Sequence, residues 1–156
     1  MAALPVSAKA PDFELDGSSG RVRLSDLLKE TQYVILAFFP ASFSSVCTSE
    51  LNLYQEVKDE FARLGARVVA ISVDSKYVQQ AFAKANGLTF PVLADFHPKG
   101  AVAEQYGVMR GDGRAERALF IVDSKGIVRY SYVSEIAKNP GADRLLEALE
   151  KLKAEA

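Results

Sequence analysis

The residue with the clearest capacity for chemistry is Cys47, the single cysteine of the chain. It follows an apolar run that ends at Pro40, and it opens a segment whose apolar residues have helical spacing. A thiol in the first turn of a helix faces unpaired N–H groups and the positive end of the helix dipole, which favour the thiolate. Cys47 is therefore a candidate nucleophile. The alternative is a cysteine that only packs, because free cysteine is among the most buried residue types.

Three neighbours of the cysteine could take part in its chemistry. Ser44 lies three residues earlier, so its hydroxyl could lie beside the sulfur, or it could cap the helix. Glu50 lies three residues later, where a carboxylate favours the helix dipole or could hold an arginine by a charge-assisted hydrogen bond. Pro40 terminates the strand and removes one N–H group near the site.

The composition limits the classes of function. A length of 156 residues suits one domain, which we expect to span 1–156. With 19 basic and 20 acidic residues there is no sign of a phosphate-neutralising surface, so we expect no nucleic-acid partner. His97 is the only histidine, and with one cysteine it leaves little material for a zinc site. We expect no metal and no cofactor.

The sequence also bears on location. No apolar run reaches the roughly 20 residues needed to cross a bilayer, so no membrane association is expected. Residues 1–11 lack the basic and apolar regions of a secretory signal. With a single cysteine, these features favour a reducing cytoplasm.

Apolar patterns along the chain predict an α/β fold. A Gly-Ser-Ser-Gly turn at 17–20 indicates an N-terminal β-hairpin, and a βαβ unit followed by a hairpin and a helix favours a mixed sheet with helices on both faces. The predicted strands are 12–15, 22–24, 33–39, 67–73, 117–123 and 127–133, with a strand or extended loop at 90–93; the predicted helices are 45–64, 75–85, 100–106 and 141–152.

Taken together, these residues resemble the peroxiredoxins. Phe38-Phe39-Pro40 with Ser44 and Cys47 reproduces the Pro-x-x-x-Thr/Ser-x-x-Cys signature of that family, and the segment 117–123 resembles its arginine-bearing strand. The segments 10–13 and 90–95 also match, so the resemblance covers nearly the whole chain. The stretch 90–108 most resembles the one-cysteine subgroup typified by bacterial alkyl hydroperoxide reductase E. The resemblance implies a thioredoxin-like fold.

The resemblance also assigns roles. It implies a thiol-dependent peroxidase that reduces hydrogen peroxide and organic hydroperoxides, in which the thiolate of Cys47 attacks one peroxide oxygen and becomes a sulfenic acid. Arg117 takes the place of the active-site arginine, Ser44 that of the usual threonine, and Pro40 would shield the site. Arg117, the Ser44 hydroxyl and backbone N–H groups near Val46 and Cys47 are the donors that we expect to bind the peroxide as its O–O bond lengthens. Glu50 is a further supporting residue.

The second half of the cycle needs an outside partner. Asn52 occupies the position where another peroxiredoxin subgroup places its resolving cysteine, and the C-terminal tail has none. The reductant is therefore expected to be a low-molecular-weight thiol with a glutaredoxin-like protein, or thioredoxin. The resemblance alone suggests a homodimer.

Two other functions stay open at this point. Ser44-Ser45-Val46-Cys47 has the spacing of a Cys-x-x-Cys motif without its first thiol, so the chain could be a thioredoxin-like adaptor that forms mixed disulfides. It could also be a binding or chaperone-like protein in which Cys47 packs. Arg110 and Arg114 are predicted to be solvated in a glycine-rich loop rather than to serve the site.

Overall fold

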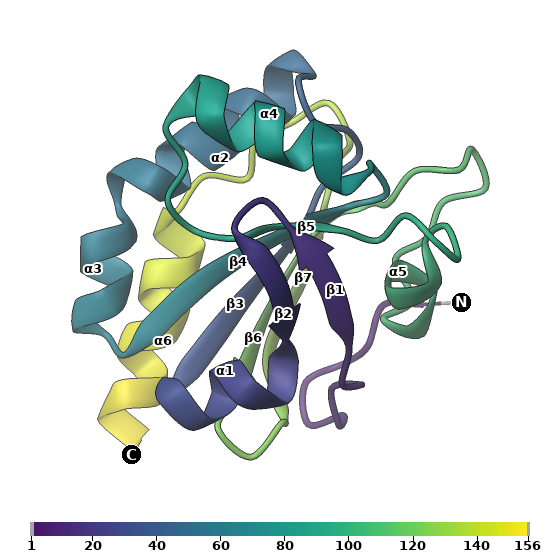
Figure 1. Cartoon of the computed structure of the whole chain (residues 1–156). Coiled ribbons are helices and arrows are strands. Elements are labelled where there is room, and N and C mark those ends of the chain that lie inside the picture. The colour runs from purple at the N-terminus through teal and green to yellow at the C-terminus, as the bar shows by residue number, and fades with distance from the viewer. Residues whose placement is uncertain (1, 156) are drawn as a thin grey trace.

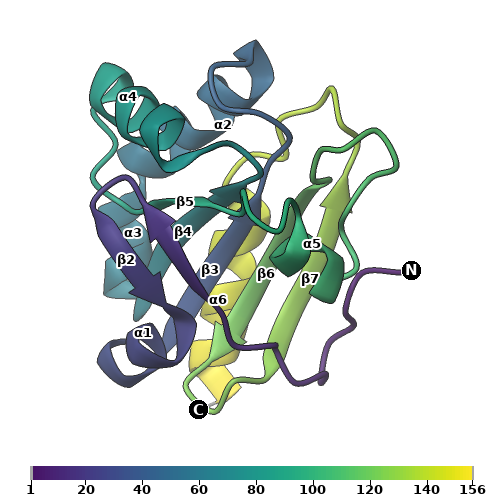
Figure 2. The same cartoon turned by 45° about the vertical axis from the view of Figure 1, so that its right-hand side comes forward.

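The computed structural model of this protein describes residues 2–155 and contains a seven-stranded mixed sheet with helices on both faces (Figures 1 and 2). The strand order is β2-β1-β5-β4-β3-β6-β7. The strands are β1 (Glu14–Gly17), β2 (Gly20–Arg23), β3 (Tyr33–Phe38), β4 (Ala66–Ser72), β5 (Val92–Ala94), β6 (Arg117–Asp123) and β7 (Val128–Ser134). The helices are α1 (Leu24–Glu30), α2 (Ser45–Glu56), α3 (Lys58–Arg63), α4 (Lys76–Asn86), α5 (Ala101–Gln105) and α6 (Asp143–Glu155).

The central strand β3 explains how the molecule builds its core. It pairs parallel with β4 and antiparallel with β6, and all its residues are buried. Alternate side chains of a strand point to opposite faces. Ile35 and Ala37 accordingly join a hydrophobic cluster with α2, α3, α4 and α6, whereas Leu36 and Phe38 join a second cluster with α1 and α5. The continuous apolar run of this strand therefore serves two cores.

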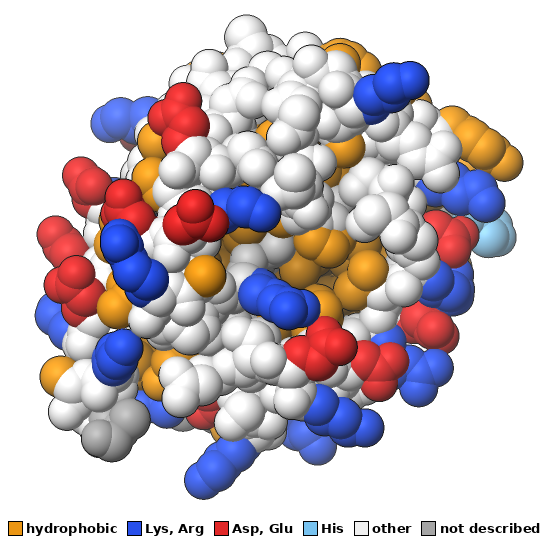
Figure 3. Space-filling view, turned by 60° about the vertical axis from the view of Figure 1, so that its left-hand side comes forward, with side chains coloured by type: hydrophobic (Ala, Val, Ile, Leu, Met, Phe, Trp, Pro, Cys, Tyr) orange, Lys and Arg blue, Asp and Glu red, His pale blue; other side chains and the backbone are white. Residues whose placement is uncertain are grey.

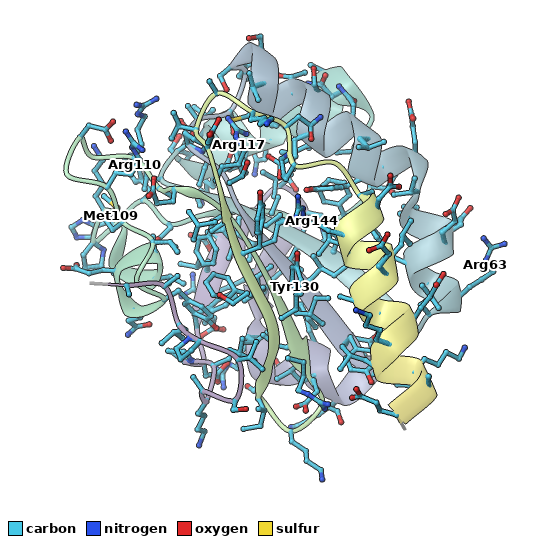
Figure 4. All side chains as sticks on the ribbon, turned by 180° about the vertical axis from the view of Figure 1, so that it is seen from behind. Arg63, Met109, Arg110, Arg117, Tyr130 and Arg144 are labelled. Atoms are coloured by element: carbon cyan, nitrogen blue, oxygen red, sulfur yellow. The ribbon has the colours of Figure 1, made fainter. Side chains whose placement is uncertain are left out.

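The last helix covers the far end of the sheet. Leu145 and Leu149 of α6 are fully buried in the first cluster. The guanidinium of Arg144 lies 3.8 Å from the centre of the Tyr132 ring on β7, and Figure 4 shows Arg144 beside the strands at this end of the sheet. A cation over an aromatic face adds to the apolar contacts that hold α6 on β7.

The predicted mixed sheet and N-terminal hairpin are confirmed, and residues 92–94 form a strand rather than a loop. The segment 22–24 was predicted as a strand, but Leu24 is the first residue of a helix, α1, that the prediction missed. The missed signal is the spacing of Leu24, Leu27 and Leu28, with acidic Asp26 in the first turn.

The single helix predicted over 45–64 is wrong, because the structure divides it at Val57 into α2 and α3. The N–H of Phe61 bonds the carbonyl of Val57 at 3.1 Å, so helical hydrogen bonding resumes at the break. Tyr54 and Phe61, one on each side, are both buried in the same cluster. The apolar pattern runs through the break because both helices bury the same face.

One open groove lies away from the elements that carry Cys47. It has a volume of about 430 Å³ and lies beside the first half of β4, with Leu27 of α1 and Lys58 of α3 among its lining residues. The space-filling view of this side shows a hollow with hydrophobic side chains in its floor and Lys or Arg side chains at its rim (Figure 3).

Candidate active site

Cys47 lies in the first turn of α2, where the chain returns from the end of β3. The thiol is fully buried, with 0% of the residue exposed. Ser44 is the N-cap residue, but its side chain makes no cap hydrogen bond. The capping role considered for Ser44 is therefore not seen, and its side chain does not occupy the first-turn N–H groups. A helix start with such groups attracts negative charge.

Arg117 comes from β6, seventy residues after the cysteine. In the antiparallel pair, Phe38 at the end of β3 lies opposite Ala118, so Arg117 lies where the chain leaves β3 for the helix. The Nη1 atom of Arg117 donates to the Sγ atom of Cys47 at 3.2 Å. Arg117 as a whole is 2% exposed. The sheet register thus brings a desolvated cation to the thiol.

The guanidinium of Arg117 is fixed on two further sides. Nη1 also donates to Oε1 of Glu50 at 2.9 Å, which forms a buried ion pair. Nε and Nη2 both donate to the backbone carbonyl of Ile136, at 3.0 and 2.7 Å. In Figure 4, Arg117 lies over the upper ends of β6 and β7. A planar fork held in this way has little freedom to leave the sulfur.

Glu50 is buried between two donors. Its Oε2 atom accepts a hydrogen bond from the Tyr54 hydroxyl at 2.8 Å, while Oε1 accepts from Arg117. Burial raises the pKa of Glu50, and the hydrogen bonds from Arg117 and Tyr54 oppose this effect. Burial, with the nearby carboxylate of Glu50 as a second cause, also raises the pKa of Tyr54, so this hydroxyl stays a donor. Of the two roles considered for Glu50, the structure shows the hydrogen bond that holds Arg117. The helix-dipole role is not supported, because Glu50 lies beyond the first turn of α2.

The remaining predicted site residues lie on the same stretch of chain. Pro40 is buried two residues after the end of β3, and Val46 lies in the first turn of α2 beside Cys47. The structure thus places Pro40, Ser44, Val46 and Cys47 between the end of β3 and the start of α2. Their roles in a reaction remain predictions.

Other residues considered from the sequence lie outside this cluster. Arg110 pairs with Glu116 and Asp112, and Arg114 pairs with Asp112, in the loop between α5 and β6. Figure 4 shows Arg110 out on this loop, away from Arg117. His97 is exposed in the segment after β5. Neither arginine is needed to explain the environment of the sulfur.

Sequence reasoning missed two features of the site. Tyr54 lies four residues after Glu50 on the same helix, a spacing that places the two side chains together and that could have identified it. The carbonyl of Ile136 is a backbone group in the loop between β7 and α6, so no residue type could have identified it.

The described part of the chain contains neither a metal-ligand cluster nor a membrane span. Among residues 2–155 there is no group of three or more His, Cys, Asp and Glu side chains that could hold a metal ion. No helix in the same range is both long enough and apolar enough to cross a membrane.

The sequence is similar to a known protein family and to two of the proteins described below. The AhpC/TSA family model matches residues 6–131. The alkyl hydroperoxide reductase E of Mycobacterium tuberculosis is 36% identical over 142 residues, which cover 90% of each chain. A chloroplastic 2-cysteine peroxiredoxin of Chattonella marina var. antiqua is 35% identical over 158 residues, covering 94% of this chain and 80% of that protein.

A solved structure extends the comparison to the fold. The crystal structure of peroxidoxin BcpB from Mycobacterium tuberculosis superimposes with a TM-score of 0.86 and 32% sequence identity. The match covers 97% of this chain and 99% of that one. The predicted thioredoxin-like arrangement of a mixed sheet between helices is thereby confirmed.

Proposed function

This chain belongs to the AhpC/TSA family of thiol-dependent peroxidases, and from that premise we propose that Cys47 is the nucleophile that reduces the peroxide. The family prediction, including the likeness to alkyl hydroperoxide reductase E, is confirmed. The roles of individual residues are proposals that the geometry supports, the reductant is proposed from the single cysteine, and the assembly is proposed from the family resemblance.

In the proposed step the thiolate of Cys47 attacks one oxygen of the peroxide. An S–O bond forms as the O–O bond breaks, so the sulfur loses two electrons and the peroxide gains them. The leaving oxygen takes a proton and departs as water or as an alcohol. The enzyme is left with a sulfenic acid on Cys47.

The contact between Arg117 and the sulfur is the observation that carries this proposal. A cysteine that only packs needs no charged partner, and a buried guanidinium is costly unless it is paired. Here Arg117 is 2% exposed, and its guanidinium directs one N–H group at Sγ from 3.2 Å. A cation at this position favours the thiolate and can bind the peroxide oxygen as negative charge develops on it.

Two further groups are proposed to act in the transition state. The Ser44 hydroxyl lies one turn before the sulfur, and the first-turn N–H groups at Val46 and Cys47 are not capped by Ser44. Donors that bind the lengthening O–O bond better than the bound peroxide raise the rate of the chemical step. Removal of one such donor in other enzymes costs roughly 10²–10³-fold in rate.

An outside thiol is proposed to complete the cycle. It attacks the sulfenic acid sulfur, forms a mixed disulfide with Cys47 and releases water, and a second thiol then displaces the reduced enzyme. Cys47 is the only cysteine of the chain, so both thiols come from other molecules. We propose a low-molecular-weight thiol with a glutaredoxin-like protein, or thioredoxin, as the source.

The substrate and setting follow from the same reasoning. We propose hydrogen peroxide and organic hydroperoxides as substrates, since the step requires only an O–O bond. A single peroxidase domain over 1–156, a cytoplasmic location and a homodimer remain proposals; the homodimer rests on the family resemblance. Sedimentation velocity at several protein concentrations tests the homodimer.

The proposed reaction can be tested on the intact protein. The chain contains no tryptophan, so the rate is best measured by competition with horseradish peroxidase for hydrogen peroxide. We expect one equivalent of peroxide to produce a single dimedone adduct on Cys47, seen by mass spectrometry, and no adduct in Cys47→Ser. A thiol that reacts no faster than free cysteine would contradict the proposal.

The same oxidised protein identifies the reductant. Low-molecular-weight thiols, a glutaredoxin with glutathione, and thioredoxin are each added, and recovery of the free thiol is followed by mass. A long-lived mixed disulfide with no peroxide reaction would instead favour the thioredoxin-like adaptor.

A further inference from the structure

The active-site loop, which we define as residues 40–44, contains an unfavourable backbone conformation. Phe43 has a φ of 71°, in the left-handed region that favours glycine. Its side chain is 55% exposed, so burial of the ring does not account for this conformation. Contacts from neighbouring segments must hold the loop in this shape.

Ser42 supplies such contacts through both its backbone and its side chain. Its N–H donates to Oδ2 of Asp74 at 2.8 Å, and its hydroxyl donates to Oε1 of Gln79 at 2.5 Å. Asp74 follows β4 and Gln79 lies on α4, so the loop is tied to two elements that are distant in sequence. We call Ser42, Ser72, Asp74 and Gln79 the Ser42 anchor.

The orientation of Gln79 is set by its own hydrogen bonds. The side chain is fully buried, and its amide nitrogen donates to Oγ of Ser72 and to the carbonyl of Leu93, both at 2.8 Å. Both amide N–H groups are thus used, and Oε1 is left to accept from Ser42. The Ser72 hydroxyl donates to Oδ2 of Asp74 at 2.6 Å, which closes the network.

The same face of α4 also contacts the next loop residue. Phe82, three residues after Gln79, packs against the ring of Phe43 with centroids 5.1 Å apart. Helix α4 therefore holds two successive residues of the loop that leads into the first turn of α2. Side chains three residues apart on a helix share a face, so one helix position sets both contacts.

We propose that Asp74 and Gln79 are positioning residues for the peroxide reaction, which act through Ser42 on the turn that carries Cys47. The proposal rests on the proposed function and adds residues that do not contact the sulfur. The Ser42 anchor fixes the loop so that the first-turn N–H groups and Arg117 meet at one point. It also keeps the fully buried sulfur out of reach of reagents much larger than a peroxide.

Loosening the anchor therefore has opposite effects on two reactions of the same thiol. The reaction with peroxide slows, because the first-turn N–H groups and Arg117 are no longer correctly placed around the sulfur. A misplacement of about 1 Å can cost up to 10²-fold in rate. The reaction with bulky thiol reagents accelerates, because the sulfur becomes more exposed. Loss of global stability alone does not produce this pair of effects under conditions where the protein remains folded.

The test uses three variants of the full chain. Asp74→Ala removes the acceptor for the Ser42 N–H, and Ser42→Ala removes only the hydroxyl bond to Gln79. Asp74→Asn keeps one side-chain oxygen able to accept from Ser42 and Ser72, so it is the conservative rescue. Thr89→Ala is the matched control, because it removes hydrogen bonds from Gln55 of α2 and Lys58 of α3 but leaves the loop untouched.

Two quantities are measured for each variant. The first is the rate constant with hydrogen peroxide, by competition with horseradish peroxidase. The second is the ratio of labelling rates for fluorescein-5-maleimide and N-ethylmaleimide, which share one chemistry and differ in size. Circular dichroism establishes that each variant is folded at the assay temperature.

We expect Asp74→Ala to lower the peroxide rate constant about ten-fold or more and to raise the labelling ratio several-fold. Ser42→Ala should change both in the same directions by less, and Asp74→Asn should stay within about two-fold of the wild type, as should Thr89→Ala. The proposal is overturned if Asp74→Ala and Ser42→Ala give the same peroxide rate constant and labelling ratio as Thr89→Ala. It is also overturned if only one of these two quantities changes. An Asp74→Asn variant that behaves like Asp74→Ala would overturn it as well.

The proposed function and this inference can fail separately. If wild-type Cys47 does not outpace free cysteine with peroxide, the proposed function fails. The labelling ratio still shows in that case whether the anchor holds the loop. If the wild type reacts rapidly but the variants do not differ from Thr89→Ala, the inference alone fails.

Discussion

At the scale of single residues, the guanidinium of Arg117 is held by three partners. Arg117 contacts the thiol of Cys47, the carboxylate of Glu50 and the carbonyl of Ile136 at the same time. Cys47 and Glu50 both accept from Nη1, whereas the carbonyl of Ile136 accepts from Nε and Nη2, so the position of one sulfur depends on a carboxylate and a carbonyl on separate elements. A lysine has neither the planar fork nor the reach to make these three contacts together.

Arg117→Ala should slow the peroxide reaction by roughly 10²–10³-fold, because a donor to the developing charge is lost. The thiolate population should change much less, since the helix start remains. The rate is measured by competition with peroxidase and the thiolate by its ultraviolet absorbance. If rate and thiolate fraction fall in parallel, Arg117 acts on the thiol alone and not on the peroxide.

Two control variants show whether a loss of rate in Arg117→Ala comes from the missing donor. Arg117→Ala leaves Glu50 buried without its cation, so the double variant Arg117→Ala/Glu50→Gln separates loss of stability from loss of rate. Arg110→Ala, on the loop outside the site, should leave the rate within about two-fold of the wild type.

Glu50 gives the site a dependence of stability on pH. Because burial raises its pKa above the ordinary value of 4.5, the folded protein binds this proton more readily than the unfolded chain does. The stability that Glu50 contributes is therefore fully present below the unfolded pKa and is lost as pH rises through the folded pKa. Relative to Glu50→Gln, the wild type should become more stable as pH falls toward about 4.5.

Urea unfolding followed by far-ultraviolet circular dichroism measures this difference at several pH values. The comparison with Glu50→Gln isolates one carboxyl, because the other titrating groups are common to both proteins. A wild type that loses stability relative to the variant on acidification would mean that the bonds from Arg117 and Tyr54 outweigh burial.

At the scale of elements, the parts of the fold that could be predicted are those with a periodic or continuous apolar pattern. The continuous apolar run of β3 predicts a buried strand, and the amphipathic spacing of α4 and α6 predicts helices. The helix α1 was missed because its seven residues give barely two turns of spacing, a short signal next to the hairpin before it. The break at Val57 could not be seen, because both helices bury one continuous face.

The residues of the site also divide into those that could be predicted from the sequence and those that could not. Cys47, Ser44 and Glu50 could be singled out by residue type and spacing, whereas Arg117 was assigned through the resemblance of the segment 117–123 to the arginine-bearing strand of the family. The bonds of Ser42 to Asp74 and Gln79 join segments 32 and 37 residues apart, and a serine, an aspartate and a glutamine in loops or helices carry no local sign of such pairing. Hydrogen bonds between distant segments depend on the packed structure and have no period in the sequence.

The hairpin is joined to the rest of the sheet at its turn. The register between β1 and β5 pairs Gly17 with Leu93, and the N–H of Ser18 donates to the carbonyl of Val92 at 2.9 Å. A Cβ atom on Gly17 would lie 2.6 Å from Cδ2 of Leu93, which is itself fully buried. The close approach of the two strands therefore requires glycine at this position.

Gly17→Ala should lower the free energy of unfolding by about 1–3 kcal/mol, because the added methyl group overpacks the junction. The peroxide rate of the folded variant should stay within about two-fold, since β1 supplies no residue to the site. Gly111→Ala, where a Cβ meets nothing within 4 Å, is the control. Equal stability of the two variants would show that β1 and β5 can separate at no cost.

At the scale of the whole molecule, the sheet divides the interior into two clusters, and the site belongs to only one. Cys47, Leu51 and Tyr54 lie in the cluster covered by α2, α3, α4 and α6, and none of them contributes to the cluster under α1 and α5. Leu36 and Leu119 lie on neighbouring strands but belong to opposite clusters. They offer a matched pair of core substitutions.

Leu36→Ala and Leu119→Ala should each lower the free energy of unfolding by about 2–5 kcal/mol, because each removes a fully buried leucine. Leu119 lies two residues after Arg117 on β6 and shares a cluster with Cys47. A cavity there lets Arg117 and α2 shift relative to each other, so this variant should also lose at least about ten-fold in peroxide rate. Leu36→Ala should keep the wild-type rate within about two-fold.

Urea unfolding gives the stabilities, and competition with peroxidase under fully folding conditions gives the rates. Equal rate losses in the two variants would mean that the sheet transmits any core defect to the site. A loss confined to Leu119→Ala would instead mean that precise placement of the thiol depends on one face of the sheet, while the other face contributes only to folding.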